Sequence, residues 1–236
     1  MRAIVLAAGL GTRMRPLTDR TPKCLLPIQG QPQLAYWFYL LHHYGVDKVL
    51  VNTHYLHEQV NAYVETTDLP VDVTLVHEPV LLGSAGTVKA NRAFVEEEDA
   101  FFIAYGDTLM DADLGALLDW HESHRQPATI GLFRSPTPSA CGIVELDDNG
   151  IVIGFEEKPR VPKSNLAFAG IAVGTPALFD YIPDEVPCDM GSQVFGRMAG
   201  RMAGWELRDA YLRDIGTPDS YARAQEEVSQ LRVKPA

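Results

Sequence analysis

Two glycines and two cations near the start of the chain form the strongest chemical signal in the sequence. Gly9 and Gly11 follow an apolar run at residues 3–7, and Arg13 and Lys23 come soon after. Glycine lets the backbone approach a ligand closely, so the amide N–H groups of such a turn can bind an anion. A guanidinium or ammonium group nearby adds full positive charge, which suits phosphate oxygens. These residues therefore predict a loop that binds a polyphosphate.

This loop differs from two common phosphate-binding motifs. The dinucleotide motif G-x-G-x-x-G needs a third glycine, and Met14 stands at that position. A P-loop needs a glycine, four residues and then Gly-Lys-Ser/Thr. Counting from Gly9 leads to Met14, and counting from Gly11 leads to Pro16, so neither motif fits.

A second chemical signal is Asp107, which directly follows the very apolar run at residues 101–105. In open α/β sheets, ligands bind at the carboxyl ends of the strands. If residues 101–105 form such a strand, the carboxylate of Asp107 faces the ligand-binding crevice.

Several short motifs, taken in order, resemble those of the sugar-1-phosphate nucleotidyltransferases, also called NDP-sugar pyrophosphorylases. The opening G-x-G-T-R and the P-K that follows are similar to residues 9–13 and 22–23. Residues 82–86 resemble L-G-T-A-G, residues 155–159 resemble F-x-E-K-P, and residues 214–218 resemble D-I-G-T-P. The resemblance runs from Met1 to about Gln225, which is nearly the whole chain.

The resemblance implies an enzyme that transfers a nucleotidyl group from an NTP to a sugar 1-phosphate and releases pyrophosphate, with Mg²⁺ as cofactor. Arg13 and Lys23 would be catalytic, and Asp107 and Asp214 would bind the metal. The implied nucleotide-binding residues are Leu6, Ala7, Ala8, Gly9, Gly11, Thr12, Arg13, Lys23, Glu78, Gly83 and Gly86. The implied sugar-phosphate-binding residues are Gly142, Glu157, Lys158 and Gly170.

Two residues bear on the choice of substrate. Glu78 can accept hydrogen bonds from the adjacent N1–H and N2 amino groups of guanine, which favours GTP with mannose 1-phosphate or heptose 1-phosphate. A structural role for Glu78, and UTP or dTTP as the nucleotide, stay open. Phe168 stands where the family usually has asparagine, so the sequence departs from the family pattern here, and the effect of this change on sugar binding stays open.

Two other functions are kept as alternatives. Asp111 and Asp113 form a D-x-D pattern, which is the metal motif of many glycosyltransferases that consume an NDP-sugar. Capping of the next helix also explains Asp113. The second alternative is a non-catalytic, pyrophosphorylase-like regulatory subunit. The presence of all the charged residues that the resemblance assigns to catalysis and metal binding argues against it.

Alternating apolar runs and turn residues predict the elements that position these side chains. The alternation of strands and helices in the first half favours a doubly wound, mostly parallel (Rossmann-like) mixed α/β sheet flanked by helices. The second half is predicted to contain strands without helices between them, and these strands would form a smaller β-rich lobe that binds the sugar. We expect strands at 48–53, 71–77, 101–105, 129–133, 143–146, 151–155 and 168–173, and helices at 34–44, 57–64, 87–94, 113–121 and 218–231.

These elements are expected to form one nucleotidyltransferase domain over residues 1–236. Residues 1–130 would bind mainly the nucleotide, and residues 131–225 would bind the sugar phosphate and supply the second metal ligand. The helix that begins after residue 86 is expected to open at Thr87 and to favour an anion at its N-terminus. His121 and His124 are expected on the solvated side of their helix.

The amino-acid composition limits the kinds of partner and bound metal to be expected for this protein. The net charge of −11 argues against nucleic acid or an anionic membrane as the main partner. The three cysteines include no C-x-x-C pair, so a zinc site or a disulfide framework is not expected. No apolar run is long enough to span a membrane, and no signal peptide precedes the first strand, so we expect a cytoplasmic protein. The oligomeric state is open, with a homo-oligomer as one option.

Overall fold

The structure is a computed structural model that describes residues 1–235. The chain forms two compact units that interleave along the sequence. Unit 1 contains Met1–Leu81, Ala104–Ala112 and the chain from Asp209 onward, and unit 2 contains Leu82–Ile103 and Asp113–Arg208.

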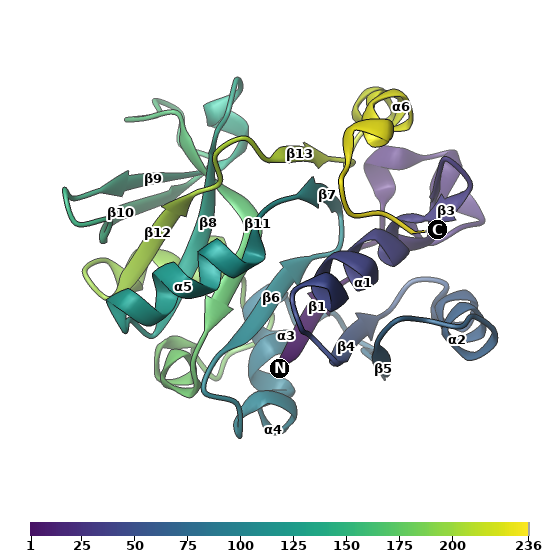
Figure 1. The fold of residues 1–236 in the computed structure, drawn as a ribbon, viewed down its shortest axis with the longest axis horizontal. Helices are drawn as coiled ribbons and strands as arrows, with labels where there is room; N and C mark the ends of the chain where they lie inside the picture. Colours follow the sequence, from purple (N-terminus) through teal and green to yellow (C-terminus); the bar gives the residue numbers. More distant parts are fainter. Residues whose placement is uncertain (236) are drawn as a thin grey trace. The chain divides into compact units, whose positions relative to one another are not determined.

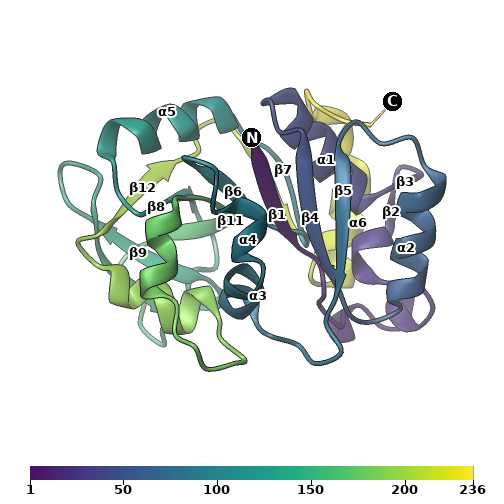
Figure 2. The same ribbon diagram turned by 90° about the horizontal axis from the view of Figure 1, so that it is seen from below.

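Unit 1 is built on three parallel strands, β1 (Arg2–Leu6), β4 (Lys48–Thr53) and β5 (Asp72–His77), which run side by side in Figure 2. The middle of β1 is fully buried, as expected for a parallel strand covered on both faces. Leu6 pairs with Asn52, and Asn52 pairs with Val76, so the carboxyl ends of the three strands lie level. This level edge is where the sheet can present a ligand site.

Short helical turns and two helices surround these strands. The chain leaves β1 into single turns at Thr12–Met14, Leu17–Asp19 and Lys23–Leu25, and then into the short hairpin of β2 (Pro27–Ile28) and β3 (Gln31–Pro32). Helix α1 (Gln33–His43) is almost entirely buried, and α2 (His57–Thr66) has a polar outer face. Both helices were predicted within about two residues at their ends.

A small antiparallel ribbon in unit 1 was not predicted. It consists of β7 (Thr108–Asp111) and β13 (Tyr211–Asp214), which lie far apart in the sequence. Helix α6 (Pro218–Glu227) follows β13, and a short turn at Val228–Gln230 ends what was predicted as one helix to residue 231. Leu109, Ile215 and Ala224 join a buried apolar cluster that holds this ribbon and α6 together.

Unit 2 is the β-rich part of the chain. It contains β8 (Ala128–Arg134), β9 (Gly142–Leu146), β10 (Val152–Glu157), β11 (Leu166–Gly174) and β12 (Met202–Glu206). Strand β12 is parallel to β8, whereas the β11–β8, β11–β9 and β10–β9 pairs are antiparallel. Figure 1 shows α5 (Leu114–His124) lying across β8, β11 and β12. The predicted α/β class, a largely parallel core with flanking helices, is confirmed.

Three local expectations in unit 2 were wrong. The helix predicted at 87–94 is two helices, α3 (Ser84–Ala90) and α4 (Arg92–Val95), so Thr87 lies inside a helix and is buried. An anion site at the amide of Thr87 is therefore excluded. His121 is also buried, against Thr129 of β8, because α5 turns this side chain toward the sheet. Burial lowers the pKa of His121.

Strand β6 (Phe101–Tyr105) was predicted to the residue, and its last two residues begin the second segment of unit 1. Asp107 follows two residues later, at the start of the ribbon. Among the residues that the structure describes, no helix is both long and apolar enough to cross a membrane.

Candidate nucleotide and metal site

An ion pair between Lys23 and Asp107 lies at the centre of the candidate site in unit 1. The Lys23 Nζ donates to Asp107 Oδ2 at 2.9 Å. The side chain of Lys23 is only 10% exposed, whereas that of Asp107 is 42% exposed. The ammonium group is therefore fixed in place, while the carboxylate stays within reach of a ligand.

The ribbon brings Asp214 next to Asp107. Asp214 pairs with Thr108 across the two strands, and the Ile215 amide donates to the Asp107 carbonyl at 3.0 Å. Asp107 lies just before the first residue of β7. The alternation of side chains along that strand therefore does not decide which way the Asp107 side chain points. Two carboxylates that are far apart in the sequence thus share one end of one ribbon.

Arg13 also belongs to this neighbourhood. A Cβ atom added to Gly216 would lie 2.6 Å from Asp214 Oδ1 and 2.8 Å from Arg13 Nη2. The amide of Gly216 itself donates to Asp214 Oδ1. The Arg13 guanidinium and the Asp214 carboxylate therefore both border the position that a side chain would take at Gly216, which has no room for a larger residue.

The glycine loop after β1 has two different kinds of glycine. Gly11 has a φ of +62°, and a Cβ there would lie 2.9 Å from Thr18 Cγ2, so packing requires glycine. A Cβ at Gly9 would meet no atom within 4 Å. Packing therefore does not require glycine at position 9, and the open space beside it is available to a ligand.

Asn52 and Glu78 support this loop, and sequence reasoning missed the first of them. The Ala7 amide donates to Asn52 Oδ1 at 2.7 Å, and Asn52 Nδ2 donates to Glu78 Oε1 at 2.9 Å. Both side chains are buried, at 4% and 3% exposure. A polar residue inside an otherwise apolar strand was the available signal for Asn52.

The second predicted glycine segment, with Gly83 and Gly86, lies in unit 2 and depends on Cys188. A Cβ at Gly83 would lie 2.3 Å from the Cys188 carbonyl oxygen. That oxygen accepts hydrogen bonds from Ala85 N and Gly86 N at 2.9 and 3.1 Å. Nothing in the sequence pointed to Cys188, because it acts through its backbone.

Three of the predicted sugar-phosphate residues, Gly142, Glu157 and Lys158, come together in unit 2. Glu157 lies between two glycines, since a Cβ at Gly142 or Gly191 would lie 2.8 or 2.6 Å from its Oε2 atom. Lys158 forms an ion pair with Glu157 at 3.3 Å, and its side chain is 65% exposed. Lys158 has a φ of +47°, and its amide donates to the Cys141 carbonyl at 3.0 Å. A positive φ is uncommon for a residue other than glycine. The surrounding structure therefore holds the backbone at Lys158, and this backbone sets the point from which its side chain extends.

An aromatic cluster stands beside Glu157. Phe195 makes edge-to-face contacts with Phe155 and Phe168, each at 5.2 Å between ring centroids. Gly170 has a φ of +79° where the pairing of β11 with β8 shifts register, between Phe168 and Ala172. Phe168 thus takes part in packing against Phe195.

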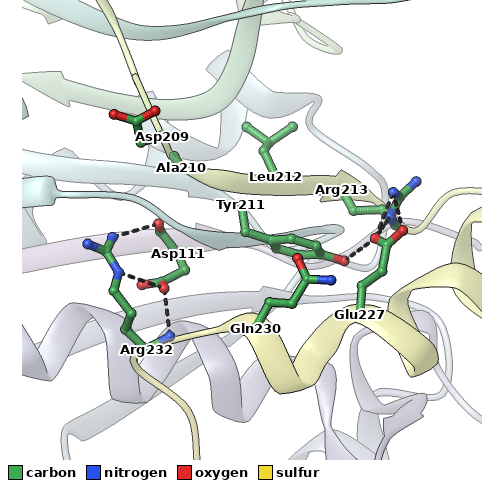
Figure 3. A pocket seen from close by; sticks show the side chains of 9 residues that line it. All are labelled: Asp111, Asp209, Ala210, Tyr211, Leu212, Arg213, Glu227, Gln230 and Arg232. Atoms are coloured by element: carbon green, nitrogen blue, oxygen red, sulfur yellow. Dashed lines mark hydrogen bonds and ion pairs between the residues drawn. The ribbon is translucent and has the colours of Figure 1, made fainter.

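The two aspartates of the D-x-D pattern have hydrogen-bond partners outside the candidate site. Asp113 caps α5 by accepting from the Ala116 amide at 2.9 Å, as the capping interpretation predicts. Asp111 is buried, and its Oδ2 accepts from the Arg232 amide at 2.6 Å and from Arg232 Nε at 3.0 Å (Figure 3). These contacts give both carboxylates structural partners.

The donor set in unit 1 fits a hard divalent cation. Mg²⁺ prefers oxygen ligands and commonly takes one or two carboxylates, with phosphates and water completing its shell. Asp107 and Asp214 supply two carboxylates, and the Lys23 ammonium already shows that a cation is held at Asp107 Oδ2. Among the described residues, no group of three or more His, Cys, Asp or Glu side chains could hold a metal by itself. The two carboxylates therefore leave the rest of the shell of a bound metal to water or to the phosphates of a nucleotide.

Residues 2–230 match the nucleotidyl transferase family, and the chain belongs to that family. The resemblance noted from the motifs is thus confirmed.

The relatives of this chain are named for different nucleotides. The UTP–glucose-1-phosphate uridylyltransferase of Synechocystis is 34% identical over 215 residues, covering 84% of this chain and 55% of that protein. The mannose-1-phosphate guanylyltransferase of Mycobacterium tuberculosis is 32% identical over 231 residues, covering 96% and 64%. The chain therefore spans less than two thirds of the length of these relatives.

Solved structures share the fold. A provisionally named glucose-1-phosphate thymidylyltransferase from Bacillus anthracis, solved in complex with a sucrose, has a TM-score of 0.86 at 23% identity and covers 100% of this chain. This chain covers 98% of that structure. HddC from Yersinia pseudotuberculosis has a TM-score of 0.80 at 22% identity, with coverage of 96% and 99%.

Proposed function

We propose that the chain transfers a nucleotidyl group from an NTP to a sugar 1-phosphate, giving an NDP-sugar and pyrophosphate. The observation that carries this proposal is the buried Lys23 on Asp107, with Asp214 on the neighbouring strand and the open glycine loop beside them. Membership of the nucleotidyl transferase family supports it.

The residues of unit 1 would bind and orient the triphosphate. Gly9 leaves room for the phosphates, and Arg13 and Lys23 neutralise the charge of the triphosphate and of the leaving pyrophosphate. Asp107 and Asp214 would hold Mg²⁺, which when bound polarises the α-phosphate and draws the two anionic substrates together. Neutralisation and positioning of this kind dominate phosphoryl-type transfers.

The residues of unit 2 would bind the second substrate. Glu157 would accept hydrogen bonds from sugar hydroxyls, and Lys158 would bind the phosphate of the sugar 1-phosphate. That phosphate oxygen attacks the α-phosphorus, and the bond to the pyrophosphate oxygen breaks. A phosphate dianion is already a competent nucleophile, so the reaction requires no general base from the protein.

We favour GTP with mannose 1-phosphate or heptose 1-phosphate. Several relatives are named mannose-1-phosphate guanylyltransferases, although the Synechocystis relative is named for UTP. Glu78 is a weaker argument for guanine than its sequence suggested, because its carboxylate already accepts from Asn52. Glu78→Gln in a competition assay with four NTPs tests whether this side chain reads the base. The cytoplasmic location and the homo-oligomer remain predictions.

The decisive experiment measures pyrophosphate release from four NTPs, each with a panel of hexose, hexosamine and heptose 1-phosphates. The proposal expects release that depends on Mg²⁺ and on both substrates. Release of NDP from an NDP-sugar would instead identify a glycosyltransferase. Binding of nucleotide without turnover by any pair would identify a non-catalytic subunit.

A further inference from the structure

The ribbon that carries Asp214 is too small to hold that carboxylate in place by itself. Each of its strands has four residues, and among the described residues β13 pairs with no strand other than β7. An isolated two-stranded ribbon is marginally stable in water. A metal ligand at the end of such a strand needs an additional anchor.

A cluster of three side chains, Tyr211, Arg213 and Glu227, supplies that anchor (Figure 3). Arg213 Nε donates to Glu227 Oε2 at 2.7 Å, and Arg213 Nη2 donates to Glu227 Oε1 at 2.9 Å. The Tyr211 hydroxyl donates to Glu227 Oε2 at 3.0 Å. One carboxylate of α6 therefore holds two alternate residues of β13. We call this cluster the β13 clamp.

The clamp is directional because side chains alternate along a strand. Tyr211 and Arg213 share one face of β13, so Leu212 and Asp214 belong to the other face. Holding the first pair on α6 fixes the rotation of the strand about its axis. Asp214 is thereby presented on the opposite face, immediately next to the clamped Arg213.

Helix α6 is a firm support for the clamp. Thr217 and Ser220 form a capping box at its N-terminus, with the Ser220 amide donating to Thr217 Oγ1 at 3.2 Å. Gln225 joins α6 to the segment around Gln29 by hydrogen bonds of 2.8 and 2.7 Å. Ala224 packs in the same buried cluster as Ile215, one residue beyond Asp214.

We propose that the β13 clamp is a positioning device for Asp214, and that Glu227 and Arg213 set the metal affinity of the site without touching the metal. This inference rests on the proposed function for the identity of Asp214 as a metal ligand. Outer residues that orient metal ligands typically change metal affinity by about 10–100-fold when replaced.

The test compares Glu227→Gln with Glu206→Gln. Glu206 accepts a similar fork from Arg134 in unit 2, with distances of 2.8 and 3.1 Å, so its variant removes an equivalent ion pair away from Asp214. Mn²⁺ binding is followed by the loss of its free EPR signal, with and without GTP. We expect Glu227→Gln to weaken Mn²⁺ binding about tenfold, and Glu206→Gln to leave it at the wild-type value. Equal Mn²⁺ affinity in wild type and Glu227→Gln would overturn the proposal.

Further variants separate positioning from general destabilisation. Arg213→Lys keeps the charge but loses the fork, and Tyr211→Phe loses one hydrogen bond, so both should weaken Mn²⁺ binding less than Glu227→Gln does. These milder variants carry the test if Glu227→Gln does not fold. In an Asp214→Asn background, Glu227→Gln should cause no further loss of Mn²⁺ binding, because coupled residues are not additive. Additive losses would contradict the clamp.

Activity provides a second, separate readout. If wild type releases pyrophosphate, Glu227→Gln should need about tenfold more Mg²⁺ for half its maximal rate and regain rate at high Mg²⁺. If wild type is active but the two Mg²⁺ curves coincide, the clamp is wrong and the proposed function stands. If wild type is inactive with every substrate pair, the proposed function fails, and the Mn²⁺ titration alone decides the clamp.

Discussion

The two units each place a lysine beside a carboxylate, and the two pairs differ in how they are held. Lys23 in unit 1 is 10% exposed and donates to Asp107 at 2.9 Å, from a segment distant in sequence. Lys158 in unit 2 is 65% exposed and pairs at 3.3 Å with its own neighbour, Glu157. The first ammonium is fixed by its surroundings, whereas the second is placed by its backbone and can move to a ligand.

This contrast indicates two different uses of positive charge. A buried, paired ammonium is preorganised, so it can stabilise developing charge without reorganising. An exposed ion pair is worth little by itself because solvent screens it. We therefore propose that Lys23 acts on the transition state and that Lys158 binds an anionic substrate.

The largest expected effect comes from removing each lysine in turn. Lys23→Met should lower kcat by about 100-fold or more, which corresponds to about 3 kcal/mol of lost charge stabilisation. Lys158→Met should act mainly on the KM of the sugar 1-phosphate, by about tenfold. Steady-state kinetics with both substrates varied measure the two effects.

Lys163 is the matched control for Lys158. It is 68% exposed and pairs with Glu145 at 3.4 Å in the same unit. Lys163→Met should leave both constants near wild type. Similar losses in kcat for Lys23→Met and Lys158→Met would erase the distinction between the two sites.

The next prediction concerns the metal affinity of the protein without nucleotide. Lys23 occupies Asp107 Oδ2, so in the free protein it competes with a divalent cation for that oxygen. Removing a like charge at this distance should tighten Mn²⁺ binding to nucleotide-free Lys23→Met about tenfold relative to wild type. EPR titration gives the affinities.

Two variants control this measurement. Lys158→Met should not change Mn²⁺ binding. The double variant that combines Lys23→Met with Asp107→Asn should not show the tighter Mn²⁺ binding expected of Lys23→Met alone. Unchanged affinity in Lys23→Met would show that Lys23 does not compete with the cation at Asp107.

The third prediction concerns the position of Glu157 in unit 2 and the binding of the sugar 1-phosphate. Glu157 is held by close backbone contact, so Gly142→Ala places a Cβ 2.5 Å from Phe155 Cζ and 2.8 Å from Glu157 Oε2. We expect an increase in the KM of the sugar 1-phosphate and a loss of about 1–3 kcal/mol of stability from overpacking. Gly196→Ala is the control, because its Cβ would lie 3.6 Å from the Phe155 carbonyl oxygen, an ordinary contact. A sugar-phosphate KM for Gly142→Ala equal to that of Gly196→Ala would mean that Glu157 does not need its present position.

The elements that sequence could predict are those with a local signal. Strands 48–53 and 101–105 are continuous apolar runs, as buried parallel strands require, and both were predicted to the residue. The glycine loop was recognisable because residue type and spacing carry its chemistry. The motifs also named Asp107 and Asp214, which the structure brings to one ribbon.

The parts that escaped prediction depend on contacts between distant segments. β7 and β13 are four residues each with mixed polarity, and about 100 residues of the chain separate the two strands that pair. Strand propensity in such short segments is set by neighbours that the sequence does not reveal. Cys188 escaped because it contributes a carbonyl oxygen, and every residue has one.

The smallest expected effect concerns stability and arises in unit 2, which buries a titratable group against its sheet. His121 is 3% exposed and lies 2.9 Å from Thr129 Oγ1 through its Nδ1 atom. Burial lowers its pKa, so the unfolded chain binds a proton more readily than the folded one. Its contribution to stability is present above about pH 6.5, the unperturbed value, and is lost as the pH falls below it.

Thermal unfolding between pH 7 and pH 5 measures this contribution. The fall in Tm over that range should be smaller in His121→Gln than in wild type, with each kcal/mol of stability worth about 2–4 °C in a chain of this size. His124→Gln is the control, because His124 on the same helix contacts Trp120 at 4.0 Å between rings and is partly exposed. It should keep the wild-type dependence on pH. Parallel Tm curves for wild type and His121→Gln would show that protonation of this buried imidazole does not limit the stability of unit 2 in acid.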